Sequence, residues 1–366
     1  MYRGLFYIPA ALFLVYPVAG YFEYFTQGDF NHTGYPLAVV YLFWYGLVFM
    51  GVMLNWLLLH DILKHLVVRF SGNSRVGILR RFASSGRTLI SRRFARAFLI
   101  VAGLTVIYTA GKMVGDTRRI VVENLFYELP GTAGLAEPFT IVHIADLHAD
   151  KYTGKKKMNR YVDIINESRP DIVVFAGDLI SSGHDHIEAG ADALAGIKST
   201  YGTWFVMGDH DYWVGTDYIA EAVKARGIHV LQNENALISH HDLDIKITGV
   251  TELYSRQIET EKLDSLLEEE SGADLHMLLS HQATDRLINV ARDSGVHQLL
   301  AGHTHGGQVK VRLFFYPVTA VRVETAYVKG NWRLGDMLLN INNGLGFTLS
   351  PVRYNAPAQV SVITVQ

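Results

Sequence analysis

Five short segments in the second half of the chain place Asp or His directly after an apolar run. They are Asp146 with His148, Asp178, Asp209 with His210, His281, and His303 with His305. The runs are typical of buried strands, and in α/β sheets the ligand crevice lies at the carboxyl ends of the strands, so these side chains should converge. Carboxylates and imidazoles gathered in one place need bound cations for electrostatic balance, and with no thiolate among them they favour zinc, manganese, iron or a similar divalent metal.

The local spacing of these residues also suits metal binding. Side chains two residues apart on an extended segment point the same way, so Asp146 and His148 can bind one ion, and His303 and His305 share that geometry. Glycines 177, 208 and 302 each precede a candidate ligand, where the backbone must pass close to the metals.

The order of the motifs resembles that of calcineurin-like metallophosphoesterases. D-x-H at 146–148, G-D at 177–178, G-[N/D]-H-D at 208–211, an isolated His at 281 and G-H-x-H at 302–305 follow one another as in that family. The resemblance covers about 119–366, and the longer GHTHGGQ segment at 302–308 is similar to the bacterial membrane-associated branch. It implies a β-sandwich flanked by helices and a dinuclear metal site.

The resemblance also implies a role for each residue. Asp146, His148 and His305 would hold the first metal, Asp178 would bridge both metals, and Asp209, His281 and His303 would hold the second. His210 would stabilise the transition state or protonate the leaving oxygen, and Asp211 would orient it. Two ions roughly 3.5–4 Å apart would activate the nucleophile and clamp the phosphoryl oxygens. The acid would contribute about 10²–10⁴ in rate.

Two positions depart from the family pattern. Asp209 stands where the family usually has Asn, and Ala283 stands where a Pro usually follows the isolated histidine. The extra negative charge of Asp209 beside the second metal should alter metal preference.

The elements that must position these residues alternate between strand and helix from residue 119 onward, which predicts an α/β domain over 116–366. Apolar strands are expected at 119–129, 139–148, 171–180, 203–211, 275–282 and 297–307, with helices at 158–168, 186–198 and 217–227 between them. The net charge of −2 gives no basic field for nucleic acid, and the absence of Cys excludes disulfides and cysteine nucleophiles.

The first 115 residues carry the apolar excess and are predicted to be transmembrane helices. The uncharged segments 4–22 and 36–59 are long enough to cross ~30 Å of hydrocarbon, and 97–111 is a shorter third candidate. A cleaved signal peptide is the alternative for the first, although only Arg3 precedes it and the apolar run is long and aromatic.

The segment 60–96 between the second and third spans is basic and predicts the orientation. Its cations are Lys64, Arg69, Arg75, Arg80, Arg81, Arg87, Arg92, Arg93 and Arg96, against the single acid Asp61. The positive-inside rule places this loop in the cytoplasm. With three spans, the catalytic domain then lies on the outer, periplasmic side of a cytoplasmic membrane.

These features predict a membrane-anchored hydrolase of a phosphate mono- or diester that is lipid-linked or belongs to the cell envelope, with membrane lipid as a partner and no nucleic acid. One alternative is pyrophosphate hydrolysis of UDP-diacylglucosamine in lipid A synthesis, a cytoplasmic reaction that the predicted orientation disfavours. Another is a non-catalytic membrane scaffold or sensor, which the complete ligand set disfavours.

Overall fold

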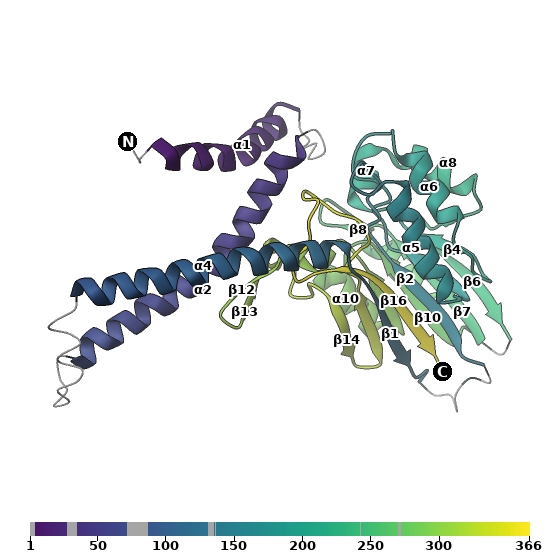
Figure 1. Ribbon diagram of the computed structural model, residues 1–366. Helices are drawn as coiled ribbons and strands as arrows, with labels where there is room; N and C mark the ends of the chain where they lie inside the picture. Colours follow the sequence, from purple (N-terminus) through teal and green to yellow (C-terminus); the bar gives the residue numbers. More distant parts are fainter. Residues whose placement is uncertain are drawn as a thin grey trace.

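A computed structural model describes residues 4–27, 35–71, 87–130, 135, 137–241, 243–269 and 272–366. Its N-terminal part consists of the long helices α1 (Gly4–Gln27), α2 (Leu37–Ser71) and α4 (Arg87–Arg118), seen on the left of Figure 1. Within these ranges, two stretches are long and apolar enough to cross a membrane, Leu37–Leu63 and Arg96–Arg118. Helix α1 contributes a shorter apolar stretch, Phe13–Phe22.

Helices α2 and α4 extend into the segment that the sequence predicts to be a basic loop. Residues 60–71 and 87–96 are helical, so the connection between the helices is shorter than 60–96. Arg75, Arg80 and Arg81 lie outside the described residues, as do the side chains of Lys64, Arg69, Arg87, Arg92 and Arg93.

The rest of the chain forms two six-stranded sheets. The first has the order β1 (Ile120–Tyr127), β16 (Ala358–Val365), β2 (Phe139–Ile144), β3 (Ile172–Phe175), β4 (Thr203–Phe205) and β5 (His229–Val230). The second has the order β14 (Gly330–Leu334), β15 (Met337–Ile341), β11 (Gln298–Ala301), β10 (Leu275–Ser280), β7 (Leu243–Val250) and β6 (Glu234–His240). Strands β2, β3 and β4 are parallel, as are β7, β10, β11 and β15, so their carboxyl ends gather along one edge of each sheet.

The two sheets pack face to face, and helices cover both outer faces. Along β2, Ile141 contributes to the core between the sheets, whereas Val142 and Ile144 contribute to the core under the helices. The helices are α5 (Lys155–Glu167), α6 (Ile187–Ala195) and α8 (Thr216–Lys224) on one side and α9 (Thr260–Glu268) and α10 (Asp285–Asp293) on the other. Strands buried on both faces need apolar residues at every position, which explains their continuous apolar runs. The predicted α/β domain with a β-sandwich flanked by helices is confirmed.

The long helices pack directly against this domain. Val48 of α2 and Met113 of α4 form a small apolar cluster with Val352 and Tyr354, which lie just before β16. The hairpin of β12 (Val311–Leu313) and β13 (Tyr316–Val318) lies against α2, where the Asn55 side chain donates to the Arg312 carbonyl at 2.8 Å. The α/β domain and the apolar helices α2 and α4 thus form one packed structure.

Candidate active site

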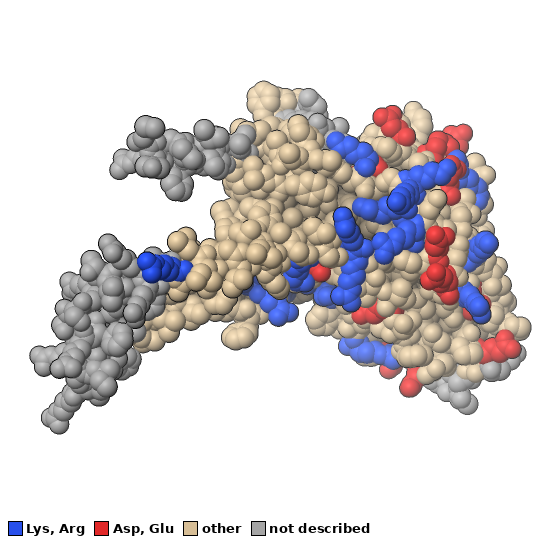
Figure 2. Space-filling model, viewed as in Figure 1, with Lys and Arg blue, Asp and Glu red and all other residues tan. Residues whose placement is uncertain are grey.

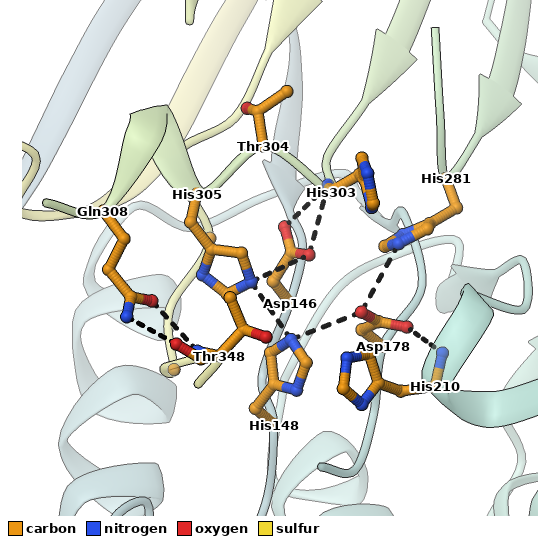
Figure 3. A network of polar contacts seen from close by, with 12 residues as sticks. Asp146, His148, Asp178, His210, His281, His303, Thr304, His305, Gln308 and Thr348 are labelled. Carbon is orange, nitrogen blue, oxygen red and sulfur yellow. Dashed lines mark hydrogen bonds and ion pairs between the residues drawn. The ribbon is translucent and has the colours of Figure 1, made fainter. Parts of the chain in front are cut away.

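The structure brings all seven predicted metal ligands together at the carboxyl ends of the strands. Figure 3 labels all of them except Asp209. Ligand atoms of Asp146, His148 and His305 lie within 4.8 Å of one another, and so do those of Asp209, His281 and His303. Asp178 lies between the two groups, with Oδ2 3.3 Å from His148 Nε2 and 3.4 Å from His281 Nε2. The site thus consists of two adjacent groups of candidate ligands with one carboxylate between them.

The first group has the chemistry that a divalent cation requires. The Nε2 atoms of His148 and His305 face each other at 3.0 Å, and both rings are buried. Burial lowers the pKa of both imidazoles, so both are neutral and direct ring nitrogens at the same point. Asp146 Oδ1 lies 3.4 Å from His305 Nε2, and its carboxylate adds the charge that balances a cation. Two neutral ring nitrogens and a carboxylate oxygen that face one another are a set of donors suited to a metal ion.

In the second group the pKa values of the imidazoles are raised, not lowered. Burial opposes protonation of His281, but the adjacent Asp178 and Asp209 carboxylates outweigh it and hold its pKa well above the usual value. Burial likewise opposes protonation of His303, but Asp209 and Glu324 raise its pKa to about 9. A proton and a metal ion compete for the same nitrogen atoms, because ligating imidazole must be neutral. Metal binding here should therefore release protons.

The backbone at the site is unusual. Positive φ angles occur at Asp146 (52°), His148 (46°), Asp178 (60°), His303 (70°) and His305 (50°). Such angles are uncommon outside glycine and gather at functional sites, where the surrounding structure holds them. The D-x-H and H-x-H pairs converge as predicted, but the predicted reason, an extended backbone in these segments, is wrong. They converge because the left-handed residues turn the chain sharply after each strand.

The close backbone approaches predicted at all three glycines are present, and a Cβ atom on Gly177 would lie 2.8 Å from His281 Nδ1. A Cβ atom on Gly302 would lie 2.7 Å from Asp146 Oδ2, and one on Gly208 would collide with the Asp178 carboxylate. Neither position could hold a larger residue without displacing a candidate ligand.

The structure separates His210 from Asp211, which the family resemblance had paired. His210 Nδ1 lies 2.6 Å from the carbonyl oxygen of Ser181, which therefore orients the ring. The buried Asp211 carboxylate instead accepts hydrogen bonds from the backbone N–H groups of Gly208, Asp178 and Leu179, each at 2.9 Å. Asp211 thus fixes the two metal-site loops to each other and does not orient the ring.

Several residues that support the site carry no motif and were missed in the sequence. Arg353 is fully buried and donates to backbone carbonyls of the loop that packs on Asp146. Gln282 Nε2 lies 3.2 Å from His303 Nδ1, and Glu324 Oε2 lies 3.1 Å from His303 Nε2. Only the position of Gln282 next to His281 could have been noticed, because Arg353 and Glu324 approach the site from distant segments.

Comparison with known proteins agrees with this geometry. Residues 139–307 match the family model described as calcineurin-like phosphoesterase. The chain therefore carries a calcineurin-like phosphoesterase domain over these residues. The matched segment includes the seven candidate ligands together with His210 and Asp211.

Individual relatives are moderately similar to this chain. It is 29% identical to the uncharacterized metallophosphoesterase YkuE of Bacillus subtilis, over 62% of this chain and 79% of that protein. It is 28% identical to phosphodiesterase YaeI of Escherichia coli, over 62% of this chain and 82% of that protein. A transmembrane protein with metallophosphoesterase domain from Danio rerio is 23% identical over 80% of this chain and 68% of its own length. That last alignment is longer than the domain and includes part of the N-terminal helices.

Proposed function

We propose that the chain is a metallophosphoesterase that hydrolyses a phosphate mono- or diester with two divalent metal ions. The observation that carries the proposal is the position of Asp178 between two groups of three ligands, with contacts of 3.3 and 3.4 Å to an imidazole of each. When bound, the cations would supply Lewis-acid activation of the attacking water and of the phosphoryl oxygens. The metal identity stays open among manganese, zinc, iron and similar ions.

The residues around the metal ligands supply the remaining chemistry. Because His210 Nδ1 contacts the Ser181 carbonyl, its proton is held there and Nε2 is left to exchange a proton with the leaving oxygen. The His210 backbone N–H donates to Asp178 Oδ1 at 3.0 Å, so the acid and the shared carboxylate are held in one geometry. His210 would act as the general acid in this scheme.

The test is metal-dependent turnover of p-nitrophenyl phosphate and bis-p-nitrophenyl phosphate by the purified full chain. Asp178→Asn should lose metal occupancy and turnover together, whereas Asp163→Asn, on the exposed face of α5, should keep both. An active Asp178→Asn protein with full metal content would contradict the shared-carboxylate arrangement. Absence of turnover by a fully metallated wild-type chain would favour the alternative of a non-catalytic scaffold or sensor.

A lipid-linked substrate is favoured by the surface beside the site. Phe314, Phe315 and Tyr316 form the tip of the β12–β13 hairpin, and Phe315 is 96% exposed. The hairpin lies against α2 and follows His305 in the chain by only a few residues. Exposed aromatic residues next to a helix able to span a membrane suit insertion among lipids.

The proposed location is the cytoplasmic membrane, with three spans and the domain on the outer side. The two long apolar stretches of α2 and α4 support membrane insertion, and α1 would supply the third span. A reporter fused after Gln366 should then behave as exported. Cytoplasmic activity of that fusion would reverse the orientation and favour UDP-diacylglucosamine pyrophosphate hydrolysis, which lipid-extract turnover followed by mass spectrometry would test.

A further inference from the structure

A second concave site lies where α2 and α4 meet the domain. It is a cavity of about 360 Å³ between the start of α2, the end of α4, the start of β1 and helix α5. None of the seven candidate metal ligands lines it. The cavity is therefore separate from the active site, although Lys151 and Tyr152 on its wall belong to the loop that follows His148.

The charge of this cavity is entirely positive. Its lining includes the five cations Arg118, Arg119, Lys151, Lys157 and Arg160 and no carboxylate. Figure 2 shows Lys and Arg side chains gathered over the same junction. Across the described part of the chain, none of these five forms an ion pair with Asp or Glu.

The carboxylates that neighbour these cations in sequence are engaged elsewhere. Asp116 pairs with Lys112 at 2.9 Å and accepts from the Asn355 backbone N–H at 2.7 Å. Asp150 accepts from Ser181 Oγ at 2.9 Å and from the Thr153 backbone N–H at 2.7 Å. The charge of Asp150 partly offsets that of Lys157, but neither carboxylate lines the cavity, so its five cations suit an anion.

The other part of the lining is apolar. Leu37 and Tyr41 of α2 face the cavity together with Ile120, Phe347 and Pro351. Lys157 links the two halves, because its Nζ lies 4.1 Å from the centre of the Phe347 ring and donates to the Tyr152 carbonyl at 2.8 Å. Partial burial lowers the pKa of Lys157 to about 8, a cost that a bound anion would offset. A ligand that fills this cavity should have an anionic group next to an apolar one.

The position along the helices indicates where that ligand comes from. The apolar stretch of α2 begins at Leu37 and that of α4 ends at Arg118, and both of these residues line the cavity. In a membrane this is the level of the lipid headgroups, where basic pockets between helices bind phosphate-bearing lipids. Figure 1 shows the end of α4 leading directly into β1 of the domain.

We propose that the cavity binds the phosphate headgroup of an anionic phospholipid of the surrounding membrane. The inference rests on the proposed membrane location but not on the proposed catalysis. The five cations contact the phosphate, and the apolar wall contacts the glycerol and the beginning of the acyl chains. Lipid bound there holds the loop that follows His148 at a fixed height above the bilayer.

The test is titration of the detergent-solubilised full chain with phosphatidylglycerol or phosphatidylcholine, read as retained lipid by native mass spectrometry. Arg118→Gln/Lys157→Gln removes two of the five cations. Each Lys or Arg near an anionic lipid is worth roughly a factor of five, so phosphatidylglycerol binding should weaken about 25-fold. The matched control is Lys224→Gln/Arg292→Gln, which removes the same charge from exposed positions on α8 and α10 and should bind as wild type does.

Two outcomes would overturn the proposal. One is equal binding of phosphatidylglycerol by the cavity variant and the control. The other is displacement of the lipid by inorganic phosphate or glycerol 3-phosphate at matched concentration, which would make the cavity a site for soluble anions. If circular dichroism shows that the first variant is misfolded, Arg119→Gln/Lys151→Gln at the exposed rim replaces it with the same expectation. Asp178→Asn should retain the lipid while losing turnover, which separates failure of this inference from failure of the proposed catalysis.

Discussion

Replacing Arg353 should test how the fold supports the metal site. Its guanidinium is fully buried and donates to the carbonyls of Gly346 at 2.7 Å, Ala356 at 2.9 Å, Asn343 at 3.0 Å and Gly344 at 3.1 Å. A further, longer contact of 3.3 Å reaches the His305 carbonyl. Burial lowers the pKa of Arg353 only to about 10, so it remains charged at neutral pH.

These carbonyls belong to chain segments that hold the first metal group. The Gly346 backbone N–H donates to the Asp146 carbonyl at 2.7 Å, and a Cβ on Gly344 would lie 2.7 Å from the Asp146 Cβ. In Arg353→Met the side-chain length is kept, but the Gly346, Ala356 and Asn343 carbonyls lose their donor. The Gly344 and His305 carbonyls keep the backbone N–H groups of Gln359 and Gln308. A buried carbonyl left without a partner costs about 1–3 kcal/mol. Removal of the buried guanidinium charge also removes its desolvation penalty, which offsets several kcal/mol of the loss from the unpaired carbonyls.

The expected net loss is about 3 kcal/mol of unfolding free energy, because only three carbonyls are left without a donor and a buried charge is removed. For a domain of this size, such a loss lowers Tm by about 6–12 °C. Thermal unfolding of the detergent-solubilised protein and metal content by mass spectrometry are the measurements. The metal content of Arg353→Met should fall as well, since Asp146 loses its backing.

Two further variants control this experiment. Arg353→Lys keeps the charge but has only three donors, so its Tm should lie between those of wild type and Arg353→Met. Arg292→Met changes an exposed Arg whose ion-pair partner is the adjacent Asp293, and its stability should stay within about 0.5 kcal/mol of wild type. If Arg353→Met matches Arg292→Met in both Tm and metal content, the buried guanidinium does not support the site.

Three other predictions concern single side chains. His210→Ala should keep its metals and lose about 10²–10⁴ in rate; loss of metal would make His210 a ligand, for which it lies close enough to His148 and Asp178. Asp209→Asn should need more free metal for half-activation, because a carboxylate is exchanged for a neutral oxygen. The rising limb of its pH–rate profile should move to lower pH, and an unchanged titration and profile would exclude Asp209 as a ligand. Burial lowers the folded-state pKa of His143 to about 4, so the unfolded chain binds this proton more tightly. The contribution of His143 to the free energy of unfolding is therefore complete above pH 6.5 and falls by about 3 kcal/mol as the pH drops to 4. Denaturation curves measured across this pH range should show a smaller loss of stability in His143→Gln. An equal loss in the variant would mean that another group causes the pH dependence.

Most of the domain could be predicted from local pattern. The apolar runs at 139–148, 171–180, 275–282 and 297–307 each contain a strand, and each strand ends before the polar residues that close the run. The helices at 158–168 and 217–227 were also found, within a few residues. Local prediction missed the short helix α7 (Asp209–Val214), which begins at the candidate ligand itself, and the β12–β13 hairpin. Neither carries a strong periodic signal, because both are short.

The convergence of the site could be predicted for a physical reason. Parallel strands bring their carboxyl ends to one edge, so polar residues that follow successive strands must meet wherever the crossovers place them. The roles that depend on side-chain direction could not be predicted in the same way. Asp211 follows His210 directly, yet its carboxylate faces the backbone of Gly208 and Leu179, because α7 turns the two side chains apart.

The sequence by itself determined the residue types and their order, which are enough to identify a metallophosphoesterase domain and a membrane-compatible N-terminal part. Only the tertiary structure decided how these parts meet. It placed Arg353 beneath Asp146, brought Glu324 to His303, and joined the ends of α2 and α4 into a basic cavity. The physical reason is that such contacts join residues far apart in the chain. The contacts are stabilised by burial and by charged or polar partners on other segments. Neighbouring positions in the sequence carry no periodic signal that predicts such contacts.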